Sequence, residues 1–397
     1  MSNVDKKTLD GEVPVRLVNY TDVYYGDRLT PGMDLLRASA SESQVRACRL
    51  FSDDVVITKD SETPDDIGVA AYVDRTAEDM VCGYHLAILR PLADAVDGRF
   101  LYWSMVSSIS RKQLSAGATG VTRYGLRLDV IGSVKLPAPP LPEQRLIADF
   151  LDAETARIDA LIAKKRRLIE LLGERLSCQI DRTVWSSDGQ LTPLTHLVPP
   201  NRRIMYGIVL PGPDVEDGVP IVKGGDVKSH RLNLASVSRT THEIEAGYVR
   251  SRLVEGDIVF AIRGGVGDVE VVPRELTGAN ITQDVARVAP GELVSVRWLL
   301  HSLRSRTTQE DVQSRITGAT IRGINIWDLG RVVIPVPDME VQVRLAARLD
   351  ALTSISQRTM SMLGAQIDLL VEHRQALITA AVTGELDVAE SIAEVAS

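Results

Sequence analysis

Residues 139–178 of this 397-residue chain read PPLPEQRLIADFLDAETARIDALIAKKRRLIELLGERLSC. After the opening proline cluster, apolar residues recur at the alternating steps of three and four that are typical of a coiled-coil seam. These residues are Ile147, Leu151, Ile158, Leu161, Leu168 and Leu172. Glu154 and Lys165 occupy the two seam positions that interrupt the pattern. The stretch predicts one long helix over 141–181, whose part from 142 to 178 is roughly 55 Å long at about 1.5 Å per residue.

A second copy of this stretch lies near the C-terminus. Residues 135–153 align without a gap on residues 333–351, an offset of 198 residues that places Gln144 on Gln342. The seam pattern continues beyond the copy, with one polar interruption at Ser356, through Leu349, Leu352, Met360, Leu363, Ile367 and Leu370. A second long helix is therefore predicted over 339–385, followed by a tail over 386–397. Because repeats indicate architecture, each helix is expected to find its packing partner within the chain.

The segments before the two helices repeat as well. Residues 1–140 and 182–338 each contain short runs rich in Val and Ile, bounded by turn residues, with one or two helical stretches. Gly120 aligns on Gly318, and Gly125 on Gly323, at the same offset of 198. The fold class is predicted as α+β, with two recognition domains in tandem pseudo-repeat separated by two long helices. The first domain is expected to be short at its N-terminus, since the second has extra residues in front.

Composition indicates an ordinary folded protein, with 44% hydrophobic and 25% charged residues. The N-terminus lacks the apolar core of a signal peptide, and no apolar run reaches the length of a membrane span. The three cysteines form no CxxC pair, which is typical of a reducing compartment. A cytoplasmic location without membrane contact is expected. The net charge of −8 opposes nucleic-acid binding unless charge is segregated on the surface or a basic partner helps.

Motifs for catalysis are missing from the sequence. There is no phosphate-binding GxxxxGK[ST] loop, no GxSxG elbow, and no pair of histidines at metal-ligand spacing. The glycine-rich segment 262–270 lacks the full GxGxxG order, so a tight turn is the default interpretation. No catalytic residue and no metal site are predicted, and the chain is not expected to be an enzyme.

Basic and small residues on loops at equivalent places in the two domains are the candidate DNA contacts. Arginine and lysine can bond base edges or phosphates, and glycine lets the backbone approach closely. The candidates are Arg16, Lys59, Thr122, Arg123 and Tyr124 in the first domain and Lys223, Arg263, Thr320, Arg322 and Asn325 in the second. The alternative is that the charged residues are ordinary solvated surface groups and that Tyr124 packs in the core.

The chain resembles the specificity subunit (HsdS) of type I restriction–modification systems. The resemblance rests on residues 13–24, 141–162, 256–269, 318–330 and 373–388. It implies that each domain reads one half of a split double-stranded DNA target and that two antiparallel helices set the unread gap. It further implies that two methyltransferase subunits dock on the helices and bind S-adenosylmethionine, while motor-nuclease subunits use ATP and Mg²⁺. The chain itself would bind no cofactor. The second helix departs from the family pattern, with DMEVQVR where the first has LPEQR.

Two other functions remain open at this point. A coiled-coil adaptor would bind only proteins, so its loops could be changed without effect on DNA. A self-contained DNA methyltransferase or nuclease would act alone with S-adenosylmethionine or Mg²⁺, which the missing motifs argue against. If the helices act as a ruler, changing their length by one turn should change the gap and leave both half-sequences unchanged.

Overall fold

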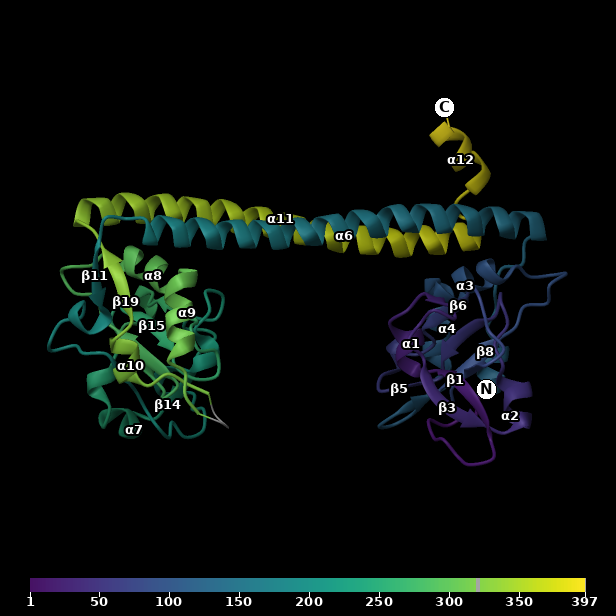
Figure 1. Ribbon diagram of the computed structural model, residues 1–397, viewed down its shortest axis with the longest axis horizontal. Coiled ribbons are helices and arrows are strands. Elements are labelled where there is room, and N and C mark those ends of the chain that lie inside the picture. Colours follow the sequence, from purple (N-terminus) through teal and green to yellow (C-terminus); the bar gives the residue numbers. More distant parts are fainter. Residues whose placement is uncertain (319–321, 397) are drawn as a thin grey trace. The chain divides into compact units, whose positions relative to one another are not determined.

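The computed structural model describes residues 1–318 and 322–396. It divides the chain into two compact units, the first formed by residues 1–166 with residues 364 onward and the second by residues 167–363. Each unit holds one recognition domain and part of both long helices (Figure 1). The helices α6 (Leu141–Trp185) and α11 (Met339–Thr383) contain 45 residues each. At 1.5 Å per residue each is about 68 Å long, longer than the sequence pattern predicted.

The first unit is built from two sheets, a small hairpin region and short helices. One sheet has the order β3-β1-β7, the second β2-β6-β4-β8, and the hairpin region β5-β10-β9. The strands are β1 (Val13–Val18), β2 (Arg28–Leu29), β3 (Leu36–Ala40), β4 (Val55–Thr58), β5 (Asp60–Ser61), β6 (Ala70–Val73), β7 (Met80–Cys82), β8 (Leu86–Leu89), β9 (Thr119–Gly120) and β10 (Tyr124–Gly125). The helices are α1 (Tyr20–Tyr24), α2 (Glu42–Cys48), η1 (Pro64–Asp66), α3 (Gly98–Val106), α4 (Ser108–Gly117) and α5 (Leu128–Gly132).

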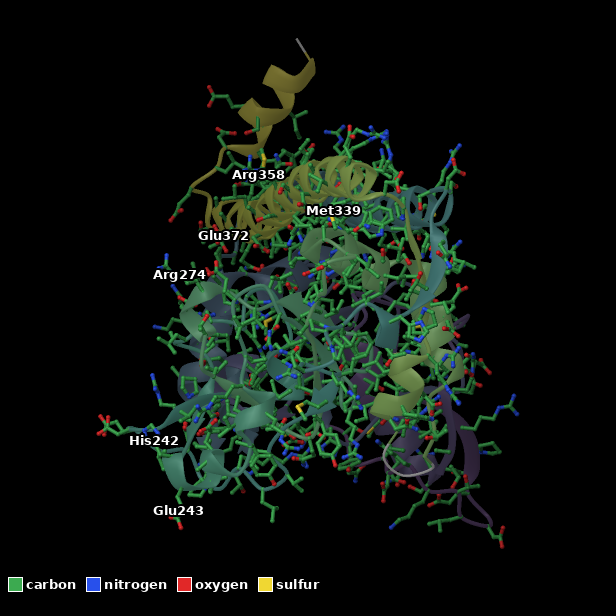
Figure 2. The ribbon with its side chains drawn as sticks, turned by 90° about the vertical axis from the view of Figure 1, so that its left-hand side faces the viewer. His242, Glu243, Arg274, Met339, Arg358 and Glu372 are labelled. Carbon is green, nitrogen blue, oxygen red and sulfur yellow. The ribbon has the colours of Figure 1, made fainter. Side chains whose placement is uncertain are left out.

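The second unit repeats this plan. Its sheets have the orders β12-β18-β15-β16, β14-β13-β17 and β11-β19. The strands are β11 (Gln190–Pro193), β12 (Met205–Tyr206), β13 (Val219–Val222), β14 (Ser238–Thr240), β15 (Ile258–Ala261), β16 (Val269–Val271), β17 (Asn280–Ile281), β18 (Val285–Val288) and β19 (Val333–Val336). The helices are η2 (Leu194–His196), η3 (Gly224–Asp226), α7 (His242–Ala246), η4 (Val249–Ser251), η5 (Arg274–Leu276), α8 (Val296–Arg304), α9 (Arg306–Ser314) and α10 (Ile326–Gly330). In Figure 2, His242 and Glu243 on α7 lie far from Met339, where α11 begins.

The central strand of each unit is buried on both faces. In β4, Val55 and Ile57 pack toward α3, α4 and the long helices, while Val56 packs toward the β1 sheet. In β15, Ile258 and Phe260 pack in the same way toward α8 and the long helices, and Val259 packs into the opposite cluster. Side chains alternate across a strand, so an unbroken apolar run such as VVIT requires cover on both sides.

The two long helices pack against each other within each unit. In the first, Leu151 near the start of α6 shares a core cluster with Ile378 near the end of α11. In the second, Val184 near the end of α6 shares a cluster with Leu349 near the start of α11. The helices are therefore antiparallel. Between them, Lys165 donates from Nζ to Gln366 Oε1 at 2.6 Å.

The predicted seam of α6 is wrong in phase at two of its residues. Leu161 and Leu168 are exposed by 42% and 45%, whereas Ile162 is buried. Of the other predicted seam residues, Ile147, Leu151, Ile158, Leu349 and Ile367 are buried and Leu172, Leu352, Met360, Leu363 and Leu370 are half-buried. Apolar residues stand at both 161 and 162, so two phases with the same steps are available. In the structure the buried side of α6 contains Thr155 and Ile162 in place of Glu154 and Leu161. The buried hydroxyl of Thr155 donates to the Leu151 carbonyl at 2.6 Å.

The predicted domain boundaries need three changes. The helix α6 continues to Trp185 rather than residue 181, and α11 ends at Thr383 rather than residue 385. The expected tail contains a further helix, α12 (Val388–Ala396). Its Val388 is buried in the core of the first unit, which explains why this segment folds instead of continuing as an extended tail.

A repeated glutamine attaches each recognition domain to its long helix. Gln144 accepts from the backbone N–H of Asp97 at 2.9 Å and donates to the carbonyls of Ala95 and Pro139. Gln342 accepts from Ser295 at 2.8 Å and donates to the corresponding carbonyls, those of Leu293 and Pro337. Both glutamines are about 1% exposed. The repeated LPEQ-type junction therefore seats both domains by the same three hydrogen bonds.

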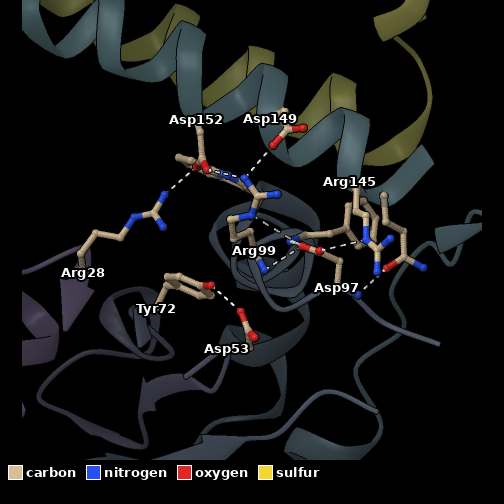
Figure 3. A network of polar contacts seen from close by, with 11 residues as sticks. Arg28, Asp53, Tyr72, Asp97, Arg99, Arg145, Asp149 and Asp152 are labelled. Atoms are coloured by element: carbon tan, nitrogen blue, oxygen red, sulfur yellow. Dashed lines mark hydrogen bonds and ion pairs between the residues drawn. The ribbon is translucent and has the colours of Figure 1, made fainter. Parts of the chain in front are cut away.

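A repeated aspartate makes the second attachment. Asp152 on α6 accepts from Trp103 Nε1 at 3.0 Å and pairs with Arg28 and Arg99 (Figure 3). At the same offset of 198, Asp350 on α11 accepts from His301 Nε2 at 2.7 Å and pairs with Arg297. Each recognition domain thus presents one helix, α3 or α8, that is bonded to a long helix at fixed positions.

Candidate DNA interface

Each unit carries a small hairpin that closes against the residue following its central strand. In the first unit, Leu126 donates to the Lys59 carbonyl at 2.8 Å, and Gly125 pairs with Asp60. In the second, Ile324 donates to the Ile262 carbonyl at 3.1 Å, and Gly323 forms a bridge with Arg263. The two ends of each loop therefore repeat in space at the offset of 198, with Thr119 paired to Gly125 and Thr317 paired to Gly323 beside the ends of β4 and β15.

The glycines at the start of these loops have a conformational reason. Gly120 has φ of +151°, and Gly318 has φ of +106°, both in the region that disfavours other residues. A Cβ on Gly120 would also lie 2.0 Å from the carbonyl oxygen of Arg123. In the first unit the backbone therefore folds back tightly, and residues 121–123 form the tip of the loop.

Beside the first loop lies a polar and aromatic cavity of about 740 Å³. Its lining includes Asp60, Ser61, Thr122 and Arg123 together with three tyrosines, Tyr20, Tyr24 and Tyr25. Tyr20 and Tyr24 stack with ring centroids 5.4 Å apart. Donation from Tyr24 Oη to Asp66 at 2.7 Å, with some burial, raises the pKa of Tyr24 to about 12. The hydroxyl therefore stays protonated, and the cavity offers both hydrogen-bond partners and flat aromatic faces.

A carboxylate is fixed at the edge of this cavity. Asp60 Oδ2 accepts from Lys59 Nζ at 2.7 Å and lies 2.7 Å from His85 Nδ1. Burial raises the pKa of Asp60, but the hydrogen bonds from Lys59 and His85 outweigh it and lower that pKa overall. The carboxylate is thus held ionised in one orientation.

The corresponding cavity of the second unit is smaller, about 300 Å³. Its lining includes Tyr206, Arg263, Gln283 and Asn325. Arg263 Nη1 lies 3.9 Å from Asp284 Oδ1, and the arginine side chain is half exposed. This site therefore presents hydrogen-bond donors where the first unit presents a carboxylate.

Three predicted contacts are engaged within the protein. Arg16 forms a bidentate pair with Asp79, with both N–O distances 2.7 Å, and donates to the Pro31 carbonyl. Lys223 Nζ donates to Ser238 Oγ at 2.8 Å. Asn325 caps α10 by accepting from the backbone N–H of Asp328 at 2.8 Å. For Arg16 in particular, the internal partners account for the side chain without any ligand.

The other predicted contacts lie at the two loops. Thr122, Arg123 and Arg322 are exposed, and Tyr124 is half-buried on β10. Lys59 directly follows β4, and Arg263 is the second residue after β15. Thr320 lies outside the described residues.

Sequence reasoning missed Asp60, His85 and the tyrosines of α1. The strand pattern did contain a signal for Asp60, because aligning DDVVITK with GDIVFAI places the next residue of each unit, Asp60 or Arg263, at the same strand end. The tyrosines of α1 reach the cavity only through the tertiary fold.

Among residues 1–318 and 322–396, no three or more histidine, cysteine, aspartate or glutamate side chains are grouped so as to hold a metal ion. Within the same described part, no helix combines the length and apolar character needed to cross a membrane.

Comparison with known proteins finds similarity to one family. Residues 36–171 match the family model of the type I restriction modification DNA specificity domain. Over 319 residues the chain is 26% identical to the EcoBI type I restriction enzyme specificity subunit of Escherichia coli. By these two matches the chain is similar to the specificity subunits of type I restriction enzymes. This match covers 74% of the present chain and 66% of the EcoBI subunit, just under two thirds of its length.

Other type I specificity subunits are similar over more of their length. The EcoKI specificity subunit of Escherichia coli is 21% identical over 365 residues, covering 85% of this chain and 76% of that subunit. The matched proteins are named as specificity subunits of type I restriction enzymes, and the matched family model as a DNA specificity domain.

Two solved structures share the fold of this chain. One belongs to work on complex assembly and conformational transition of the type I R-M system; it has a TM-score of 0.76 at 17% identity and covers 97% of this chain and 95% of that chain. The HsdS subunit from Thermoanaerobacter tengcongensis has a TM-score of 0.57 at 18% identity, with 94% and 92% covered. These similarities confirm the predicted α+β class with long helices.

Proposed function

We propose that this protein recognises a split double-stranded DNA target, with each recognition domain contacting one half of it. The observation that carries the proposal is the pair of repeated loop ends, Thr119 with Gly125 and Thr317 with Gly323, each followed by a residue that donates to the carbonyl just after the central strand. Both loops bear an exposed arginine, Arg123 or Arg322, beside a cavity or strand end that carries polar side chains. Arginine can contact phosphates or bond guanine through two hydrogen bonds.

The long helices would fix the spacing between the two half-sites. Each domain is bonded to a long helix through a buried glutamine and an aspartate, and these attachments repeat at the same offset. A domain held at several points on a continuous helix cannot shift along it without breaking buried hydrogen bonds, which costs about 1–3 kcal/mol for each group left unpaired. The helices therefore suit the role of a spacer.

The outer faces of the helices would dock the methyltransferase subunits. On α6, Leu161 and Leu168 are exposed and seven residues apart; on α11, Ile355, Met362 and Leu369 repeat at the same interval and are each more than 60% exposed. Residues seven apart lie on one face of a helix. Such a regular apolar stripe is what a partner helix would cover. The two leucines misassigned to the internal seam thus become candidates for partner contact.

The assembled complex would supply what this chain lacks. Two methyltransferase subunits would bind S-adenosylmethionine, and motor-nuclease subunits would use ATP and Mg²⁺, in the cytoplasm. The net charge of −8 means that partner subunits would also have to provide part of the contact with phosphates.

The test is to map methylated bases in cells that carry this chain with its methyltransferase subunits. Arg322→Ala is expected to relax or weaken one half-site by about 1–3 kcal/mol if Arg322 contacts a base, and Arg123→Ala should do the same for the other half-site. Arg46→Ala, which removes an exposed arginine on α2, serves as the control and should change neither. Unchanged methylation in both loop variants would refute direct DNA recognition and favour the adaptor alternative.

A further inference from the structure

The two residues that follow the central strand, Lys59-Asp60 in the first unit and Ile262-Arg263 in the second, occupy the same place in both units. The Lys59 backbone N–H donates to the His85 carbonyl at 3.0 Å, and the Ile262 backbone N–H donates to the Asp284 carbonyl at 2.8 Å. The hairpin donation to the Lys59 and Ile262 carbonyls matches as well. These backbone bonds superimpose Asp60 on Arg263 and His85 on Asp284, so the side chains can be compared position by position.

The charges at this place are inverted. In the first unit a carboxylate, Asp60, lies at the strand end with an imidazole beside it at 2.7 Å. In the second unit a guanidinium, that of Arg263, lies at the strand end with the carboxylate of Asp284 at 3.9 Å. Each strand-end side chain lines the cavity beside its loop. The same framework therefore presents an acceptor in one unit and donors in the other.

Asp60 is arranged to accept one more hydrogen bond. Lys59 and His85 both contact Oδ2, which orients the carboxylate. Among the described residues, Oδ1 has no hydrogen-bond donor, and it is not among the buried side-chain atoms left without a partner. Oδ1 is therefore open to an outside donor, and about a fifth of the side chain is exposed. A carboxylate held in this way loses little freedom when it binds.

We infer that Asp60 selects cytosine in the first half-site and that Arg263 selects guanine at the corresponding place of the second. In the major groove cytosine presents an N4 amino donor, which a carboxylate accepts, whereas guanine presents the O6 and N7 acceptors that arginine bonds together. Adenine also has an amino donor, but its neighbouring N7 is an acceptor and repels a carboxylate. The inference rests on the proposed function and adds which base each domain selects.

Amide substitutions test the assignment through base identity. An amide matches adenine N6 and N7 together. Asp60→Asn should therefore change one cytosine of the first half-site to adenine and leave the second half-site unchanged. Arg263→Gln should change one guanine of the second half-site to adenine. Asp74→Asn, which alters an exposed aspartate outside the cavity, is the control and should change neither. A purely structural role for Asp60 would lower methylation overall without changing which base is selected.

Base analogues test the same contacts with the unaltered protein, so the test does not depend on the variants folding. Replacing the assigned cytosine by 2-pyrimidinone, which lacks the N4 amino group, should weaken binding of the assembled complex about tenfold or more. Replacing the assigned guanine by 7-deazaguanine should do likewise. If neither analogue at any position of the half-sites weakens binding, the inference is wrong. If the base assignment fails while Arg123→Ala and Arg322→Ala still change their half-sites, the proposed function survives. If those two variants also have no effect, the base assignment and the proposed function are both wrong.

Discussion

At the scale of single residues, His301 differs from its counterpart Trp103 in one physical respect: it can titrate. Both rings donate a hydrogen bond to the repeated aspartate of the long helix. His301 is fully buried, and its Nδ1 has no hydrogen-bond partner among the residues that the structure describes. Burial lowers the pKa of His301 despite the neighbouring Asp350. Protonating Nδ1 would leave an unpaired N–H in the core, so the ring is neutral with the proton on Nε2.

This makes the stability of the second unit dependent on pH. The folded chain binds the His301 proton less readily than the unfolded chain, so the stabilisation is complete above the unfolded pKa of about 6.5 and is lost as pH falls below it. Chemical unfolding from about pH 7 to pH 5 should show a decrease of at most about 1.4 kcal/mol per pH unit from this residue. His301→Gln keeps a donor for Asp350 and should remove that part of the slope. The matched change at an exposed histidine, His230→Gln, should retain it; equal slopes in the two variants would contradict the assignment.

The sequence allows a residue's role to be predicted where the residue is repeated in both halves of the chain. It does not allow this where the residue's hydrogen-bonding partner lies far away in the sequence. The alignment of Gln144 with Gln342 marked a position that proved to have the same buried role twice. Arg16 looked available for DNA because nothing nearby in sequence pairs with it. Its partner Asp79 is 63 residues away and is brought next to it only by the sheet.

At the scale of elements, the sequence predicts the existence of both long helices but not the rotation of α6 about its axis. Apolar residues at 161 and 162, and again at 168 and 169, satisfy two seams that share Leu151, Ile158 and Leu172. The two seams differ at the position after Leu151, which is Glu154 in the predicted seam and Thr155 in the observed one. A threonine can be buried because its hydroxyl bonds to its own helix, whereas a glutamate cannot be buried without a partner. Such a distinction rests on packing, which periodicity alone does not contain.

The corrected phase makes a direct prediction for neighbouring residues. Ile162→Ala should lower the free energy of unfolding by about 2–4 kcal/mol, because Ile162 is buried between the helices. Leu161→Ala should lower it by no more than about 0.5 kcal/mol, because Leu161 is exposed. The same Leu161→Ala change should weaken assembly with the methyltransferase subunits, measured by size-exclusion chromatography of the mixed subunits. Equal destabilisation by the two substitutions would contradict the corrected phase, and a larger loss for Leu161→Ala would restore the phase predicted from sequence.

At the scale of the whole molecule, the 198-residue offset predicted a duplicated plan, and the structure adds how the duplication is joined. Each compact unit includes part of both long helices; the second is the continuous stretch 167–363, whereas the first combines residues 1–166 with residues 364 onward. The first unit is completed by Ile378 and Val388 from the end of the chain. Contacts between such distant segments could not be derived from local patterns, although the antiparallel pairing implied by the family resemblance is consistent with them.

The ruler role predicts the effect of lengthening both helices together. Inserting one matched heptad after Arg166 in α6 and another after Leu363 in α11 preserves the steps of the seam, because seven residues complete two turns of a coiled coil. The insertion adds about 10 Å to each helix. Since duplex DNA rises about 3.4 Å per base pair, the unread gap should grow by about three base pairs. Mapping of methylated bases should recover both half-sequences unchanged, because neither loop nor either glutamine attachment is altered. A heptad inserted in α6 alone is the control: it leaves the pairing with α11 out of step and should abolish methylation. Altered half-sequences with an unchanged gap would show that the helices do not set the spacing.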